Sequence, residues 1–128
     1  MSFSPPVDSS EYAPVVKPMI FTEGRIMQQL LEKNFKKRVM RELKAIDGLY
    51  CFIKEAVALR GIPDIIGVYR GRFFAFELKK SEKSAQEKTG RIVLQKVIIN
   101  KINKAGGYAC IAYPENWNEV LNTLKEFK

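Results

Sequence analysis

The sequence predicts an α/β fold in which a mixed β-sheet is flanked by helices, in the order α-β-β-β-α-β-α. Three patterns lead to this prediction. Apolar residues recur at steps of three and four over residues 23–46, the spacing of an amphipathic helix. Two short apolar runs lie on either side of Arg70-Gly71, as in a β-hairpin. Residues 108–113, YACIAY, are apolar almost throughout, which is typical of a strand covered on both faces.

The length and the N-terminal composition indicate how the chain is organised. Its 128 residues are the usual length of one domain and are enough to bury a core without disulfides or metals. Residues 1–22 are rich in proline, so we expect a flexible N-terminal arm there and a single domain over residues 23–128. No apolar run is long enough to span a bilayer, and the N-terminus lacks the pattern of a secretory signal. We therefore expect a cytoplasmic protein of a bacterium or a phage-infected cell, with no membrane partner.

The first helix and strand are expected in the segment that follows the arm. Thr22 can cap a helix over residues 23–46, and Asp47-Gly48 can end it. Residues 49–54, LYCFIK, read as the first strand. The helix is expected to bury one apolar face, made of Ile26, Leu30, Leu31, Phe35, Val39, Met40 and Leu43.

The remaining elements follow the hairpin. Residues 81–90 are polar and are expected to form a loop or a helix entry. A second helix is expected over residues 91–104, ended by Gly106-Gly107, with Ile92, Gln95, Val97–Ile99 and Ile102 on or near its buried side. The strand at residues 108–113 and a last helix over residues 116–126 complete the domain.

The composition excludes several classes of site. The chain has no histidine, which rules out Ser-His-Asp and Cys-His triads and histidine-ligated metal centres. Cys51 and Cys110 lie far apart among apolar neighbours and are expected to be reduced core residues rather than zinc ligands. The net charge of +8 is spread along the body of the chain, which indicates a surface that binds a polyanion. Charge alone does not separate nucleic acid from an anionic membrane or an acidic protein.

The hairpin brings three ionisable residues together if its loop has two residues. With Arg70 and Gly71 in the loop, Tyr69 faces Arg72, and Asp64 then lies directly across from Glu77. Cross-strand neighbours have Cβ atoms about 5 Å apart on one face. Lys79 follows Glu77 by two residues and so leaves the strand on the same face. The sequence thus predicts two carboxylates and an ammonium at one spot.

Such a cluster has a chemical and a structural interpretation. Two facing carboxylates repel each other unless one is protonated or a cation bridges them, and oxygen ligands suit Mg²⁺ or Mn²⁺. With such an ion, Asp64, Glu77 and Lys79 contain the parts needed for phosphodiester hydrolysis. Alternatively, Glu77 and Lys79 are an exposed strand face, and Asp64 is a turn residue after Pro63.

The joint pattern resembles a known family. Gly61-Ile62-Pro63-Asp64, followed by Gly71-Arg72-Phe73 and Phe76-Glu77-Leu78-Lys79, is similar to the signature of the PD-(D/E)XK nucleases, and most similar to their virus-type replication-repair branch (VRR-NUC). The resemblance extends to Gln95 and to Gly106-Gly107-Tyr108-Ala109, and it spans roughly residues 30–124. It implies a restriction-endonuclease-like core, and the family includes enzymes that cut Holliday junctions.

The resemblance also implies further site residues. Family members usually have a glutamate on the first helix that reaches the metal, and Glu32 matches it best, with Glu42 and Glu23 as alternatives. Gln95 would orient Lys79 or the attacking water; otherwise it is a half-buried residue bonded to the backbone. Tyr69, Phe73 and Phe74 are expected in the core rather than as base-stacking platforms. From their positions along the chain, phosphate contacts are expected from a set of basic residues: Lys36, Lys54, Arg60, Arg70, Arg72 and Lys80. The alternatives are ordinary surface charges for Lys54 and Arg60 and a dimer surface for Arg70 and Arg72.

These observations combine into one functional prediction. We expect a Mg²⁺- or Mn²⁺-dependent DNA endonuclease, with the metal held by Asp64, Glu77 and Glu32 and with Lys79 and Gln95 completing the catalytic set. Branched DNA such as a four-way junction is the expected substrate, and two symmetric cuts would require a homodimer. The alternatives are a homing-type or nicking endonuclease and a nucleic-acid-binding protein without catalysis.

Overall fold

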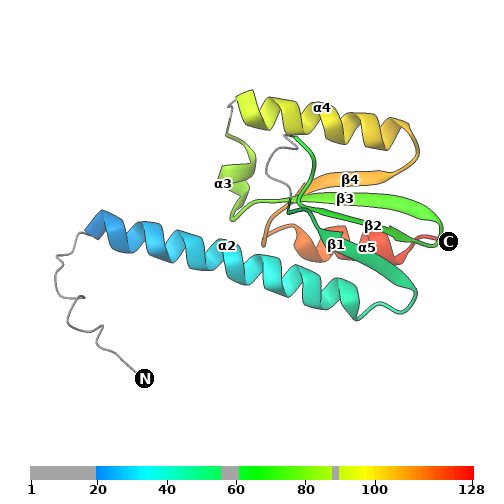
Figure 1. The fold of residues 1–128 in the computed structure, drawn as a ribbon, viewed down its shortest axis with the longest axis horizontal. Helices are drawn as coiled ribbons and strands as arrows, with labels where there is room; N and C mark the ends of the chain where they lie inside the picture. The colour runs from blue at the N-terminus through cyan, green and yellow to red at the C-terminus, as the bar shows by residue number, and fades with distance from the viewer. Residues whose placement is uncertain (1–19, 56–60, 88–89) are drawn as a thin grey trace, which may run out of the picture. The chain divides into compact units, whose positions relative to one another are not determined.

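The computed structural model describes residues 20–55, 61–87 and 90–128 (Figure 1). The described residues divide into two units, with the boundary between Leu31 and Glu32. The elements are, in order, α2 (Ile20–Lys44), β1 (Leu49–Ile53), β2 (Ile65–Tyr69), β3 (Arg72–Leu78), α3 (Glu82–Ala85), α4 (Gly90–Lys104), β4 (Tyr108–Ala112) and α5 (Trp117–Lys125). The predicted class, a mixed sheet flanked by helices, is confirmed.

The four strands form a sheet in the order β1-β2-β3-β4. β1 pairs with β2 and β2 pairs with β3, in both cases antiparallel. β4 joins the edge of β3 in the parallel direction, because the chain crosses over through α4 before it returns. The β2–β3 hairpin therefore occupies the middle of the sheet and holds its residues in a rigid register.

One face of the sheet carries the larger core. Within residues 32–128, the second half of α2 and the amphipathic α5 pack there against alternate residues of the strands. Trp117 from α5 is fully buried and meets Phe35 and Phe76 edge to face. This core packs against one face of the hairpin, and α4 packs against the other face of the sheet. Its buried members from α2 are Phe35, Val39 and Leu43.

The opposite face carries a smaller core under α4. Ala75 of β3, Ala109 of β4 and Ile99 of α4 form its buried part. The small alanine side chains let the helix approach the strands closely. Because α4 packs on this face, residues of β3 that point the same way, such as Glu77, can be buried beneath it.

Several expected details of the helices are wrong. α2 begins at Ile20, so Thr22 lies inside the helix rather than at its cap, and α2 ends at Lys44. A short helix, α3, interrupts the expected loop, so the order α-β-β-β-α-β-α omits one element. Ser81 caps α3, because its hydroxyl accepts a hydrogen bond from the Ser84 amide over 3.2 Å.

The first half of the predicted buried face of α2 is also wrong. Ile26, Leu30 and Leu31 are exposed, whereas Phe35, Val39 and Leu43 are buried. In α4, Val97 is exposed, although Ile92, Gln95 and Ile99 are buried as expected. Helical periodicity identifies an apolar face, but it does not show how far along the helix a partner covers that face.

Cys51 and Cys110 are both free, and Cys51 is buried whereas Cys110 is half-buried. Within the described residues, no helix is long and apolar enough to cross a membrane. The predicted N-terminal arm falls mainly on residues 1–19, outside the described part of the chain.

Candidate functional site

The register predicted for the hairpin is confirmed. Tyr69 pairs with Arg72 and Ile65 pairs with Phe76, so Arg70 and Gly71 are the two loop residues. Both have positive φ, 56° and 76°, as a type I′ turn requires. Gly71 adopts this conformation without strain, since it has no Cβ. Continued by one residue, the same register sets Asp64 opposite Glu77.

Asp64 lies where β2 begins and is held by two backbone contacts. Its carboxylate Oδ2 accepts a hydrogen bond from the Leu78 amide over 3.0 Å, across the hairpin. Its carbonyl oxygen accepts one from the Lys54 amide over 2.7 Å, which extends the β1–β2 pairing by one residue. These contacts hold Asp64 at the end of the sheet.

The approach to Asp64 explains part of the Gly61-Ile62-Pro63 sequence. Gly61 has a φ of 78°, and a Cβ added there would lie 2.8 Å from Leu94 Cγ on α4. A glycine is therefore required for both its conformation and the close approach to the helix. Lys54 ties down the same segment, since its ammonium donates to the Ile62 carbonyl over 2.7 Å.

Glu77 is a buried carboxylate beneath α4. It is only 4% exposed, and its Oε2 accepts a hydrogen bond from Gln95 Nε2 over 2.9 Å. The Lys79 ammonium lies 3.7 Å from the same oxygen, which confirms that Lys79 leaves β3 on the side of Glu77. The resemblance implied that Gln95 orients Lys79 or a water, but in the structure its amide binds Glu77.

The environment of Glu77 disfavours its ionised form. Burial, together with the nearby charge of Asp64, raises the pKa of Glu77 from 4.5 to about 7. The charges of Lys79, Lys54 and Arg91 oppose this rise but do not cancel it. A carboxylate that is half protonated near neutral pH gains stability from any additional cation beside it.

The donor set of this cluster fits a divalent cation. Glu77 Oε1 is buried and has no hydrogen-bond partner, and the same is true of Gln95 Oε1. A buried carboxylate oxygen without a hydrogen-bond partner lowers the stability of the fold, and a bound cation would remove this cost. Carboxylate and amide oxygens without nitrogen or sulfur ligands suit Mg²⁺ or Mn²⁺.

The third carboxylate expected on the first helix is not brought into this cluster. Among the residues that the structure describes, no group of three or more Asp, Glu or Cys side chains is close enough to share a metal ion. Glu32 is exposed on α2. The alternative, Glu42, accepts hydrogen bonds from Trp117 Nε1 over 2.8 Å and from Arg38 Nε over 3.1 Å. The side chain of Glu23 lies outside the described residues.

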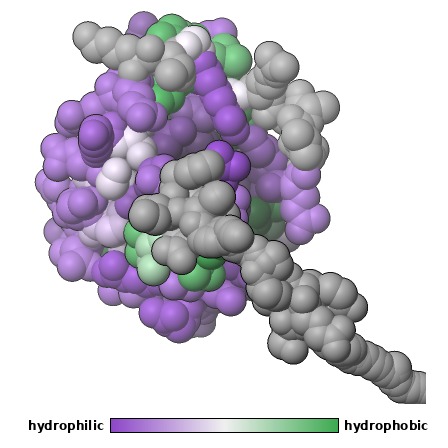
Figure 2. Space-filling view, turned by 90° about the vertical axis from the view of Figure 1, so that its left-hand side faces the viewer, coloured by the Kyte–Doolittle hydropathy of each residue, from purple (hydrophilic) through white to green (hydrophobic). Residues whose placement is uncertain are grey.

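The basic residues expected to contact phosphate fall into different environments. Lys54 lies close enough to Glu77 to lower its pKa, and Lys36 and Lys80 are half-buried. Arg70 stands in the hairpin turn with its guanidinium 5.6 Å from the Tyr69 ring centroid. Arg60 lies outside the described residues. Most of the residues that are coloured in the view of Figure 2 are hydrophilic.

Arg72 is engaged within the fold. Its guanidinium donates to the carbonyls of Gly106 and Gly107 over 3.0 and 3.3 Å, and it stacks 4.4 Å from the Phe127 ring centroid. These contacts tie the hairpin to the entry of β4. Arg72 therefore has a structural role that its sequence position did not indicate.

Sequence reasoning overlooked Arg91, whose charge acts on Glu77. A signal was available, because Arg91 precedes Gln95 by four residues and therefore shares its side of α4. The aromatic predictions were right for Tyr69 and Phe74, which are buried, and wrong for Phe73, which is 42% exposed.

Comparisons with known proteins add one similarity. No known protein-family profile matches this chain, and no solved structure matches it. A curated protein of similar sequence is the transcription elongation factor GreA of Shouchella clausii (strain KSM-K16), which is 30% identical over 106 residues. The alignment covers 77% of this chain and 66% of the elongation factor, so the chain spans just under two thirds of the length of that relative.

Proposed function

We propose that this protein is a metal-dependent DNA nuclease whose centre is formed by Asp64, Glu77 and Lys79. The observation that carries the proposal is the buried, unpartnered carboxylate oxygen of Glu77, with a second carboxylate opposite and a lysine 3.7 Å away. The oxygens of a buried structural ion pair normally all have hydrogen-bond partners, whereas Glu77 Oε1 in this cluster has none. A PD-(D/E)XK, restriction-endonuclease-like core belongs to the same proposal.

Asp64 and Glu77 would hold a Mg²⁺ or Mn²⁺ ion. When bound, such an ion lowers the pKa of a coordinated water and polarises a phosphate oxygen. Two protein carboxylates are sufficient for magnesium sites that also use substrate phosphate and water as ligands. Glu32 as a third ligand remains a proposal that its own substitution tests.

The other residues of the chain prepare this centre. Gln95 donates to Glu77 Oε2 and so holds the carboxylate in one orientation. Lys79, whose ammonium lies 3.7 Å from Glu77 Oε2, would supply positive charge to the scissile phosphate as negative charge develops on it. Lys54 holds the Ile62 carbonyl and thereby the segment that leads into Asp64.

The substrate class rests on charge and on the resemblance. A net charge of +8 favours a polyanion, and phosphodiester hydrolysis next to that charge favours nucleic acid. Branched DNA as substrate, and a homodimer that makes paired cuts, are supported by the resemblance to the VRR-NUC branch. A homing-type or nicking enzyme would share the centre but cut at a defined sequence.

Cleavage assays on paired variants test the proposal. Purified protein with Mg²⁺ or Mn²⁺ is incubated with four-way junctions, plain duplex and single strands. Asp64→Asn and Lys79→Met should abolish cleavage while DNA binding survives, and Glu119→Gln, an exposed control on α5, should leave cleavage unchanged. Full activity of Asp64→Asn would overturn the nuclease proposal. Uniform cutting of plain duplex would contradict the preference for junctions, and full activity of Glu32→Gln would remove Glu32 from the ligand set.

The similarity to a transcription elongation factor favours a second candidate, a role in transcription without hydrolysis of DNA by this chain. In that case, Asp64, Glu77 and Lys79 would serve the fold and the charge of the surface. An effect of the protein on transcript elongation in vitro that persists in Asp64→Asn would favour this candidate over the nuclease.

A further inference from the structure

The face of the sheet that carries Asp64 and Glu77 has an ordered arrangement of side chains. Because side chains alternate along a strand, Tyr50, Phe52 and Lys54 of the β1 segment lie on this face. The pairing places Phe52 beside Ile66 and Tyr50 beside Val68, and Val68 in turn beside Phe73. Successive rows across the sheet therefore run from charged, at Lys54 and Asp64, to apolar and aromatic.

This aromatic surface, made of Tyr50, Phe52, Val68 and Phe73, is largely uncovered. The exposed fractions of these residues are 67%, 48%, 41% and 42%, and the rings of Tyr50 and Phe52 are 6.2 Å apart. α4 packs on the β3–β4 side of the same face, over Ala75 and Ala109. Large exposed apolar groups that lie together, rather than singly, usually mark a binding surface.

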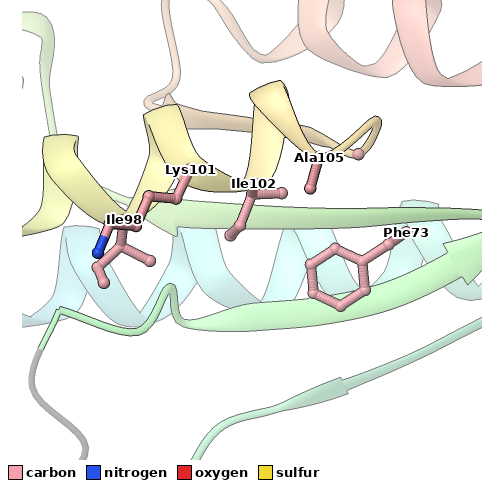
Figure 3. Close-up of a pocket in the computed structure, with 6 residues that line it drawn as sticks. Phe73, Ile98, Lys101, Ile102 and Ala105 are labelled. Carbon is pink, nitrogen blue, oxygen red and sulfur yellow. The ribbon is translucent and has the colours of Figure 1, made fainter.

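A pocket adjoins the surface where α4 meets β3. It has a volume of about 370 Å³ and is lined by Phe73, Ile98, Lys101, Ile102, Ala105 and Gly107. Figure 3 shows the Phe73 ring lying below α4, with the Lys101 side chain coming from the helix above. The apolar walls therefore carry a single cation, which suits a ligand that has both flat apolar groups and negative charge.

We propose that the aromatic surface stacks the unpaired bases of a nucleic-acid strand whose backbone runs toward Asp64 and Glu77. The proposal deepens the proposed function and rests on it for the cleavage step. Bases stack on exposed aromatic side chains in many single-strand-binding proteins, including those that present the rings on a β-sheet. The strand would thus enter the nuclease centre in unpaired form.

The spacing of the rings supports bases as the occupant. Tyr50 and Phe52 are two residues apart on β1, and their ring centroids are 6.2 Å apart. Stacked bases in a duplex rise by about 3.4 Å, so the two rings match a strand whose bases are drawn apart. Each ring would then receive its own base.

Charge favours nucleic acid over a second copy of this chain. Lys54 stands at one end of the aromatic surface and Lys101 lines the pocket at the other. A second copy, also with a net charge of +8, would be repelled by the net charge of this chain, whereas the negative charge of a phosphate backbone would be attracted to it. Because the aromatic surface adjoins the row that carries Asp64, a nucleic-acid strand bound on it would lead toward Asp64 and Glu77.

The experiment measures binding without cleavage. Every protein carries Asp64→Asn, and fluorescence anisotropy follows labelled oligo(dT), oligo(U) and a blunt duplex. Tyr50→Ala and Phe52→Ala should each weaken binding of the single strands roughly five- to a hundredfold, the effect of losing one stacked base, with little change for the duplex. Tyr50→Trp should retain affinity. Val93→Ala, at an exposed position on α4, is the matched control and should behave as the parent protein.

Three results would overturn the proposal. The first is that Tyr50→Ala and Phe52→Ala bind both single strands as tightly as the parent protein. The second is that the two variants lose affinity equally for duplex and single strand. The third is that Tyr50→Ala dissociates a dimer in sedimentation velocity while its binding of single strands is unchanged. The last result would assign the surface to a second copy. Preference for oligo(dT) or oligo(U) would identify the strand as DNA or RNA and supports the proposal in either case. Because binding is measured in a cleavage-deficient background, a failed nuclease proposal would not alter this result.

Discussion

Removing the charge of Glu77 should stabilise the protein at neutral pH when no divalent cation is present. Glu77→Gln keeps the size of the side chain and an oxygen that can accept the Gln95 amide, but it cannot ionise. In the folded protein the pKa of Glu77 is about 7, against an ordinary value of 4.5, because of burial and the charge of Asp64. The folded state therefore binds this proton more tightly than the unfolded chain does.

The sign and the size of the change in stability follow from this difference in pKa. A carboxyl whose pKa is raised by folding destabilises the fold as it ionises, so the free energy of unfolding should fall as pH rises from 4.5 to about 7. At 1.36 kcal/mol per pH unit, the loss is about 3 kcal/mol. Glu77→Gln should not show this loss, and it should match the parent protein below pH 4.5.

Urea unfolding with a chelator, on both sides of this pH window, measures the effect. Glu119→Gln, which removes an exposed charge on α5, is the control and should follow the parent protein. Saturating Mn²⁺ should restore stability above pH 7 in the parent but not in Glu77→Gln. Parallel stability curves for the parent and Glu77→Gln across the window would refute the reasoning, since Glu77 would then not be held in a site that disfavours its charge.

Two further predictions concern the scaffold. Gly67→Ala should lower the free energy of unfolding by about 3 kcal/mol, because its Cβ would lie 2.5 Å from the Tyr50 carbonyl oxygen and against the Phe74 ring. Gly90→Ala is the control, since there is open space around Gly90. Equal urea midpoints for the two variants would contradict the close packing around Gly67. Glu42→Gln should cost about 1 kcal/mol at neutral pH, since burial of this carboxylate is outweighed by the hydrogen bonds from Trp117 and Arg38, which hold its pKa below 4.5. That stability is present above pH 4.5 and is lost as pH falls through the lowered pKa, so a difference that persists in strong acid would disprove the role of the charge.

The sequence by itself determined the hairpin and therefore the pairing of Asp64 with Glu77. Strand alternation has a period of two, and a glycine in the second loop position permits the tight turn, so the register follows from local rules. The position of Lys79 beside Glu77 follows from the same alternation. Local periodicity likewise located α2, α4, β4 and α5 to within a few residues.

Tertiary packing decided which side chains are buried and which contacts they make, and neither follows from local sequence patterns. Whether Ile26, Leu30 and Leu31 are covered depends on what lies beside the first half of α2, and the described structure leaves them exposed. The contact of Gln95 with Glu77 depends on how α4 crosses the sheet. That same crossing buries Glu77 and raises its pKa, and it leaves Tyr50 and Phe52 uncovered on the far side of the face. The sequence thus determined which residues share a face, and the placement of one helix decided which of them are buried and which can meet a ligand. The physical reason is that register is set by neighbouring residues, whereas burial and electrostatics depend on elements that are distant in the chain.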